Sequence, residues 1–249
     1  MEYFADTNIG KVRKKNEDFF YAGDNLFIVA DGMGGHNAGE VASRIAVEVF
    51  TKNFDRSLKD KIEKASSAKN DGLTPHKIEE LLLRSIRTAN KEVFDTAVSK
   101  SEYYGMGTTF TGCFIHGQKA YIIHVGDSRL YIKRGDEINL LTSDHTIVGE
   151  LFRRGEMSYD DTFDHPQRNY LTRVLGVAED IDPDLSSHKI FKKDIILICS
   201  DGLNSMLKDI EISNIINKYK NAGDITKNLI KGAINKGGQD NITVIVIKK

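Results

Sequence analysis

Four short apolar segments of this 249-residue chain each meet an aspartate at a turn, and this repeated junction constrains the fold more than any other feature. The segments are "LFIVAD", "AYIIHVGD", "IILICSD" and "DNITVIVI", which contain Asp31, Asp127, Asp201 and Asp240. A single turn aspartate is common and faces water. Here each aspartate adjoins a segment apolar enough to be a core strand. If such strands lie side by side, their carboxylates converge, and clustered anions require a counter-charge.

A divalent cation is the counter-charge that fits these residues. The sequence has no Cys-x-x-Cys or His-x-x-x-His pair, and carboxylates and backbone carbonyls suit Mg²⁺, Mn²⁺ or Ca²⁺ rather than zinc. The calcium-loop pattern is also absent, so we expect ligands gathered from separate strands. In "FIVADGMGGHNAGE", Asp31 would be a ligand and Gly32 would let its own carbonyl approach the metal. The glycines that follow would turn the chain tightly into a helix.

Further charged candidates stand near the N-terminus. Glu17 and Asp18 lead into another strand in "NEDFF", and Arg13 stands just upstream in "KVRKKNED". Solvated surface charge is the default interpretation of such a short basic run. Arginine, however, is the side chain that grips a phosphate with two parallel hydrogen bonds, so we also consider Arg13 as a phosphate ligand.

The order of the predicted elements indicates the fold class. Besides the four segments above, "FFYAG", "TTFTGCFIHG" and "RLYIKRG" have the composition of strands. Helical spacing occurs over 39–54, over 75–98 with Thr74 as N-cap, near 209–218 and over 222–236. The polar stretch 55–74 between the first two helices is expected to be a surface excursion, partly helical. Successive strands and paired helices favour an α+β fold of antiparallel sheets with helices outside, in a single folded unit.

Composition excludes several classes of protein. The 35 basic and 36 acidic residues nearly balance, so we expect no nucleic-acid partner and no polybasic membrane anchor. The chain begins without the pattern of a signal peptide and has no apolar stretch long enough to span a membrane, which predicts a cytoplasmic protein. Cys113 and Cys199 lie in apolar segments and are expected to be buried thiols rather than a disulfide.

Eight segments in order resemble a known family. They are "RKKNED", "ADGMGGHNAGE", "GTTFTG", "HVGDSRLY", "SDHT", "HPQRNYLTRVLG", "ICSDGL" and "GGQDNIT". Together they resemble the PPM family, the metal-dependent serine/threonine phosphatases of type 2C, in its compact bacterial form. The resemblance spans nearly the whole chain. It implies a β-sandwich of two antiparallel sheets flanked by helices in αββα layers, as one catalytic domain over 1–249 with a flap at about 144–173.

The resemblance also implies the chemistry of the site. Phosphoserine and phosphothreonine in proteins would be hydrolysed by a metal-activated hydroxide, with two Mn²⁺ or Mg²⁺ ions in the core and a third in bacterial members. The implied ligands are Asp31 bridging both ions, the Gly32 carbonyl at the first, Asp201 and Asp240 at the second, and Asp127 at the additional ion. Glu17 and Asp18 would hold metal-bound waters, and Arg13 would bind the phosphate.

One departure from the family pattern leaves the general acid open. Many eukaryotic relatives have a histidine directly after the Asp-Gly pair, where this chain has Met33. His36, three residues later, is one hypothesis for the group that protonates the leaving oxygen, and a metal-bound water, which we favour, is the other. His124 is expected to be a hydrogen-bonded core residue, whereas His145 and His165 are expected to brace the flap.

The resemblance also implies partners, and two rival functions are weighed against it. The resemblance implies phosphorylated proteins as substrates and a cognate eukaryotic-like serine/threonine kinase as the opposing enzyme. A haloacid-dehalogenase-like phosphatase would need D-x-D-x-T, and the nearest string, "ADTNIG", lacks it. A non-catalytic phosphoprotein-binding module on the same fold would lose metal ligands. Each matched ligand position here is still an aspartate, which favours the enzyme.

Overall fold

The computed structural model describes residues 1–34, 38–65, 73–162 and 165–249, without the side chains of 59–65 and 159–160. Its strands are β1 (Glu2–Asn8), β2 (Asp18–Gly23), β3 (Leu26–Met33), β4 (Gly107–Thr108), β5 (Phe110–His116), β6 (Lys119–Val125), β7 (Arg129–Arg134), β8 (Glu137–Leu140), β9 (Asp184–Lys189), β10 (Ile195–Cys199) and β11 (Ile242–Lys248). Its helices are α1 (Gly39–Ala65), α2 (Pro75–Ser99), the 3₁₀ turn η1 (Ser101–Tyr103), α3 (Ile147–Arg153), α4 (Tyr159–Thr162), α5 (Asp201–Asn204), α6 (Asp209–Lys218) and α7 (Ala222–Asn235).

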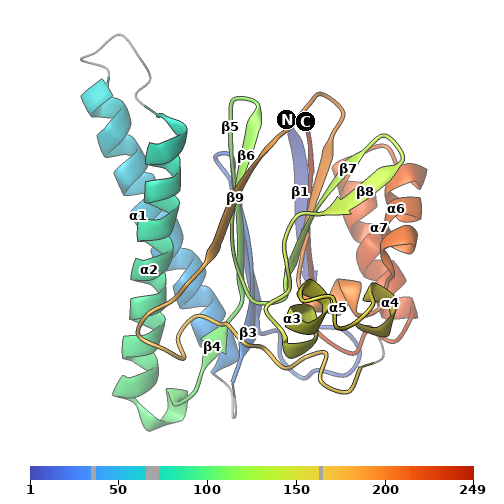
Figure 1. Cartoon of the computed structure of the whole chain (residues 1–249), viewed down its shortest axis with the longest axis horizontal. Coiled ribbons are helices and arrows are strands. Elements are labelled where there is room, and N and C mark those ends of the chain that lie inside the picture. The colour runs from blue at the N-terminus through green and yellow to red at the C-terminus, as the bar shows by residue number, and fades with distance from the viewer. Residues whose placement is uncertain (35–37, 66–72, 163–164) are drawn as a thin grey trace.

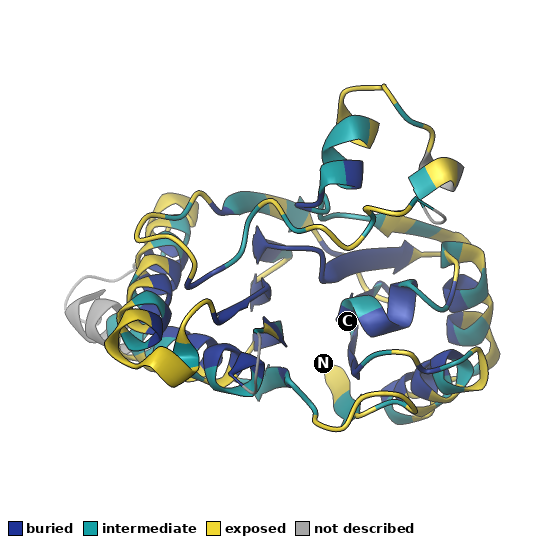
Figure 2. Cartoon of the chain, turned by 90° about the horizontal axis from the view of Figure 1, so that it is seen from below, coloured by how far each residue is buried: buried dark blue, intermediate teal, exposed yellow. Residues whose placement is uncertain are grey.

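Two antiparallel sheets pack face to face, with helices on both outer faces (Figure 1). One sheet has the strand order β1-β11-β10-β7-β8, and the other has the order β2-β3-β5-β6-β9, with β4 paired to β3. Helices α1 and α2 cover the second sheet, and α6 and α7 cover the first. The view from below in Figure 2 shows buried strands between the two helical layers. The predicted α+β sandwich in αββα layers is confirmed.

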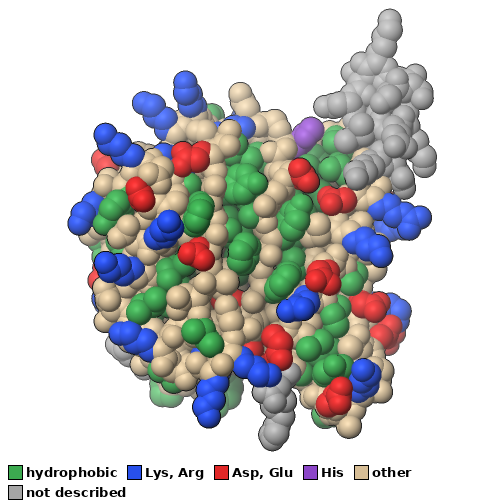
Figure 3. Space-filling view, turned by 180° about the vertical axis from the view of Figure 1, so that it is seen from behind, with side chains coloured by type: hydrophobic (Ala, Val, Ile, Leu, Met, Phe, Trp, Pro, Cys, Tyr) green, Lys and Arg blue, Asp and Glu red, His purple; other side chains and the backbone are tan. Residues whose placement is uncertain are grey.

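The surface mixes both signs of charge. The rear face in Figure 3 shows Lys and Arg side chains interspersed with Asp and Glu, with hydrophobic side chains between them. Such mixing agrees with the near-zero net charge and gives this face no single-sign field. Within the described part of the chain, no helix is both long enough and apolar enough to cross a membrane.

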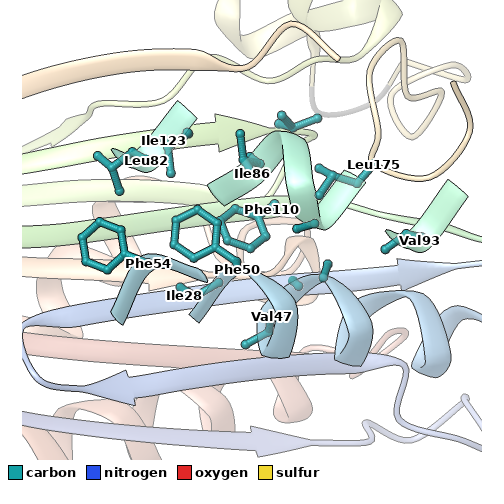
Figure 4. Close-up of a cluster of buried hydrophobic side chains, with 14 of the residues drawn as sticks. Ile28, Val47, Phe50, Phe54, Leu82, Ile86, Val93, Phe110, Ile123 and Leu175 are labelled. Carbon is teal, nitrogen blue, oxygen red and sulfur yellow. The ribbon is translucent and has the colours of Figure 1, made fainter. Parts of the chain in front are cut away.

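Three apolar layers hold the sandwich together. The layer between the sheets contains Phe27 and Val29 from one sheet and Ile198 and Ile245 from the other, all with no exposed surface. A second layer lies between the helices α1 and α2 and their sheet, where Phe50 packs 4.7 Å from Phe110 between ring centres (Figure 4). A third lies under α6 and α7. Full burial of one such side chain contributes about 1.5–3 kcal/mol, so these layers fix the strand ends relative to one another.

The central strands match the sequence prediction, and the missed strands are peripheral. All seven predicted apolar segments form strands. The missed β1, β8 and β9 are sheet edges, and the missed β4 is a two-residue strand. Edge strands such as β9, "DLSSHK", remain half exposed and therefore lack an apolar pattern.

The first residues of the four predicted helices and the buried thiols agree with the structure. Thr74 caps α2, and its side chain accepts a hydrogen bond from the Lys77 N–H. Helix α1 continues to Ala65, so the polar stretch after residue 54 is partly helical, as expected. Cys113 and Cys199 are buried free thiols.

Candidate metal centre

The aspartates singled out from the sequence lie at one end of the sandwich, which we call the acidic end and define by Asp18, Asp31, Asp127, Asp201 and Asp240. Asp18 opens β2 and pairs in register with Asp31 of β3. Asp127 follows β6, Asp201 follows β10 at the first residue of α5, and Asp240 precedes β11. This end lies opposite the two chain termini (Figure 1). Antiparallel order brings the ends of β3, β6 and β10 together with the starts of β2 and β11.

The carboxylates of the acidic end are buried and repel one another. Burial, and next the carboxylates of Asp18 and Asp201, raise the pKa of Asp31 well above its ordinary value. Burial raises the pKa of Asp18 to about 7 against two hydrogen bonds that lower it. Burial and the charge of Asp240 raise the pKa of Asp201 to about 6, and burial and Asp201 raise that of Asp127. The acidic end therefore lacks positive charge for its number of carboxylates.

Two carboxylate oxygens at the acidic end show whether a metal ion suits this site. Asp18 Oδ2 accepts hydrogen bonds from the hydroxyls of Ser200 (2.7 Å) and Thr243 (2.6 Å). Asp18 Oδ1 and Asp201 Oδ1 are buried and have no hydrogen-bond partner among the described residues. Buried polar atoms without partners are costly, and oxygen donors suit a hard divalent cation. The donor set fits Mg²⁺ or Mn²⁺.

The described residues do not present a completed metal cage. No three carboxylate, imidazole or thiol side chains in the described ranges already meet as a preformed site. Asp240 Oδ2 instead accepts a 2.6 Å hydrogen bond from Arg13 Nη2, and both side chains are partly exposed. Arg13, predicted to bind phosphate, thus reaches the acidic end but pairs with a predicted ligand there. The individual ligand roles stay predictions.

Close backbone contact explains the glycine after Asp31. A Cβ atom on Gly32 would lie 2.1 Å from the Gly39 carbonyl oxygen and 2.6 Å from that of Glu17, so only glycine fits there. The contact brings the start of α1 against the end of β3, as the glycine-rich stretch predicted. Thr109 holds the same strand, because its hydroxyl accepts from Asp31 N–H at 2.9 Å. His36, the candidate general acid, lies outside the described residues.

Several supporting residues carried no motif signal of their own. The side chain of Asn241, which is buried, accepts from the Glu17 N–H at 2.8 Å and donates to the carbonyls of Ile9 and Lys15. It thereby ties the loop that carries Glu17 to the start of β11. Asn241, Ser200 and Thr243 are polar residues at or inside apolar strands, and that interruption is the only signal by which the sequence could have indicated them.

The segment predicted to be a flap, 144–173, borders the acidic end in its described residues. Its two stems pair through an isolated bridge between Thr146 and Leu171, and it stands out from the sandwich in Figure 2. A cavity of about 110 Å³ lies between the flap and the sandwich. Its lining joins Asp127 and Asp201 to Phe152 and Arg168 of the flap. Any substrate that reaches the acidic end from this side therefore contacts the flap.

Two of the histidines considered above, His124 and His145, are buried near this flap. His124 is buried and hydrogen-bonded, with Nδ1 2.9 Å from the Thr111 hydroxyl, in agreement with the prediction of a core residue. His145 is also fully buried at the foot of the flap. The His165 ring accepts a local hydrogen bond from the Gln167 N–H.

Comparison with known proteins defines the class. A family model described as protein phosphatase 2C matches residues 13–224. The serine/threonine phosphatase Stp of Listeria innocua is 36% identical over 248 residues, which cover 98% of this chain and 94% of that protein. The protein phosphatase PhpP of Streptococcus pneumoniae is 33% identical over 252 residues, which cover 99% of this chain and 97% of that protein.

Solved structures agree with the sequence comparison. The serine/threonine phosphatase of S. agalactiae superposes with a TM-score of 0.86 and 35% identity, covering 100% of this chain and 99% of that one. The catalytic domain of the phosphatase PstP in complex with two manganese ions gives 0.83 and 30% identity, covering 98% and 96%. This class is the metal-dependent protein serine/threonine phosphatases.

The chain belongs to the protein phosphatase 2C family, also called PPM, and it is a protein serine/threonine phosphatase of the bacterial type. The predictions of family, fold and enzymatic activity are confirmed. The haloacid-dehalogenase-like and non-catalytic alternatives are excluded.

Proposed function

We propose that this phosphatase hydrolyses phosphoserine and phosphothreonine in proteins with two divalent cations, Mn²⁺ or Mg²⁺, held at the acidic end. One observation carries the proposal: two buried carboxylate oxygens, Asp18 Oδ1 and Asp201 Oδ1, have no partner within the described part of the chain. Asp31, Asp201 and Asp240 would bind the core ions together with the Gly32 carbonyl. When bound, the cations supply a nucleophilic hydroxide at neutral pH and neutralise the phosphoryl oxygens.

The remaining residues of the acidic end would prepare the site and orient the substrate. Asp18 is fixed by its two hydroxyl donors, so its free oxygen and the Glu17 carboxylate would accept hydrogen bonds from ordered water. Arg13 has 51% of its side chain exposed and contacts Asp240. Its guanidinium would therefore bind a phosphate beside that ligand. A guanidinium there would hold phosphate oxygens in the ground state and the transition state alike.

Three finer points complete the proposal. Asp127, at the turn after β6, would hold a third ion beside Asp201, whose charge acts on it. The whole span 1–249 would act as one catalytic domain with the flap at 144–173. The substrates would be proteins phosphorylated by a cognate serine/threonine kinase, in the cytoplasm.

Phosphate release from a phosphothreonine peptide tests the metal requirement. Chelated enzyme should be inactive, and added Mn²⁺ or Mg²⁺ should restore turnover. Asp201→Asn should remain nearly inactive at every metal concentration, because the change deletes a ligand charge while keeping the side-chain shape. Asp95→Asn is the matched control, since Asp95 lies on α2 and pairs with Lys91 at the surface. Full activity after exhaustive EDTA treatment would show that the mechanism is wrong.

A further inference from the structure

His145 makes an unusual double contact with one residue of the sheet. Its backbone N–H donates to the Gly126 carbonyl at 2.8 Å, and its ring Nδ1 accepts from the Gly126 N–H at 3.1 Å. Both polar backbone groups of Gly126 are thus held by the same histidine. Gly126 directly precedes Asp127, the proposed ligand of the third ion.

The opposite ring nitrogen fixes the orientation of the imidazole. Because Nδ1 accepts a hydrogen bond, the proton of the neutral ring is on Nε2. Nε2 lies 3.1 Å from Asp184 Oδ2, off the line of an ideal hydrogen bond, so the contact is mainly electrostatic. Asp184 Oδ1 in turn accepts from Arg173 Nη1 at 2.8 Å. Burial lowers the pKa of His145 in spite of Asp184, which keeps the ring neutral and Nδ1 an acceptor.

If the two hydrogen bonds between His145 and Gly126 are lost, the backbone at Gly126 has little freedom to adopt another conformation. Its φ is +107°, a conformation that L side chains rarely adopt, and a Cβ atom there would lie 2.6 Å from Thr109. The same Thr109 hydroxyl accepts from the Asp31 N–H and contacts the Ser128 hydroxyl at 2.8 Å. The turn through Gly126 and Asp127 is therefore packed against the strand that carries Asp31. A rotation of the Gly126 peptide would displace the Asp127 carboxylate.

His145 also belongs to the flap stem. Its carbonyl accepts from the Thr172 N–H at 2.8 Å, and the Ile147 N–H donates to the Tyr170 carbonyl at 3.0 Å. The two stems of the flap are thus hydrogen-bonded to each other at the same residue that contacts Gly126. A contact that holds the Asp127 turn on one side and both flap stems on the other couples the two.

We propose that His145 is a positioning residue for Asp127: it locks the Gly126–Asp127 turn and ties it to the foot of the flap. The inference rests on the proposed function, because the role of Asp127 at a third ion is part of that proposal. His145 does not contact substrate in this role. It acts through the orientation of the Asp127 backbone.

Two amide variants separate the two ring contacts. In His145→Gln the longer amide can reach toward Asp184 but leaves the Gly126 N–H without its acceptor. In His145→Asn the amide oxygen can take the place of Nδ1. Loss of a supporting contact to a metal site typically costs about 10–100-fold, so His145→Gln should lose kcat in that range, with KM changed less than about threefold. His145→Asn should restore most of the loss.

Mn²⁺ binding is the measurement that distinguishes a positioning role of His145 from a purely structural one. Calorimetric titration with Mn²⁺ should show the two core sites retained in His145→Gln and the additional site weakened. A double-mutant cycle with Asp127→Ala should show that His145→Gln has no further effect once Asp127 is gone. His188→Gln is the matched control, because His188 lies on β9 and its ring contacts the hydroxyl of Ser186, two residues away on the same strand. The control should match the wild type in kcat and metal titration.

Each outcome decides one question. If Asp127→Ala leaves turnover and Mn²⁺ binding unchanged, the proposed role of Asp127 is wrong. If Asp127→Ala impairs both but His145→Gln resembles the wild type, or keeps its full effect without Asp127, the inference about His145 is overturned. Should His145→Gln fail to fold, Asp184→Asn takes its place in the same cycle. That variant removes the charge that faces both Nε2 of His145 and Arg173, and the part of its effect that acts through His145 must likewise vanish without Asp127.

Discussion

The buried His124, which is hydrogen-bonded to the residue just before the flap, should make the free energy of unfolding depend on pH. The side chain lies at the end of β6 with 1% of its surface exposed, and Nε2 donates to the Ser143 carbonyl at 3.2 Å. Burial, and after it the neighbouring His145, lower the pKa of His124 from 6.5 to about 4. The folded protein therefore holds a neutral ring at this position.

The size of the effect follows from proton linkage. Unfolding returns His124 to its ordinary pKa, so that between pH 6.5 and about 4 the unfolded chain binds a proton that the folded protein does not. The contribution to stability is complete above pH 6.5 and is lost as the pH falls. One pH unit per proton is worth about 1.4 kcal/mol, so the loss reaches about 3 kcal/mol at the lower limit.

Urea unfolding of the EDTA-treated protein measures this loss. His124→Gln should be less stable than the wild type at about pH 7.5, because a buried, well-packed side chain is replaced. The difference between the two free energies of unfolding should shrink by roughly 1.4 kcal/mol per pH unit below about pH 6.5, since glutamine does not titrate. His76→Gln removes an exposed imidazole at the start of α2 and serves as the control. Parallel curves for wild type and His124→Gln would refute the reasoning.

Three further predictions concern the site. Metal-free Asp201→Asn should unfold at higher urea concentration than metal-free wild type at neutral pH, because the raised pKa of Asp201 makes its ionised form destabilising; a lower midpoint would contradict this. Arg13→Ala should mainly raise KM in peptide kinetics, whereas a loss confined to kcat would place Arg13 at the developing charge. If His36 is the general acid, His36→Ala should slow phosphopeptide hydrolysis roughly a hundredfold but spare p-nitrophenyl phosphate, and equal small effects would favour a water.

The sequence was sufficient for the central strands and for the residues of the acidic end. Strands buried on both faces, such as β3, β6 and β10, carry continuous apolar segments, and the aspartate at the end of each stands out against them. Edge strands such as β1 lack that contrast, because water covers part of their surface. The pattern therefore predicts the inside of the sandwich better than its rim.

The contacts that hold the site could not be predicted, because they depend on strand register. Ser200 and Thr243 meet Asp18 although they lie more than 180 residues away in sequence. The hydrogen bond from the Gly126 N–H to His145 likewise requires the flap stem to return to the end of β6. A serine, threonine or histidine near a strand end has many possible partners in one dimension. Only the packed sheets select among them.

The same buried carboxylates that define the site also link its occupancy to the stability of the fold. Burial raises the pKa of Asp18 to about 7 and that of Asp201 to about 6. At neutral pH the folded metal-free chain therefore binds part of a proton at Asp18, which the unfolded chain releases, and holds Asp201 mainly as a buried anion. Folding without a cation must therefore either protonate these groups or bury their charge, and both cost free energy. A divalent cation bound only by the folded state reverses that cost, because it replaces the protons and stabilises the fold by mass action. Under the proposed function, the strand ends can thus keep an arrangement that is unfavourable alone, since the ion proposed for hydrolysis would also stabilise it.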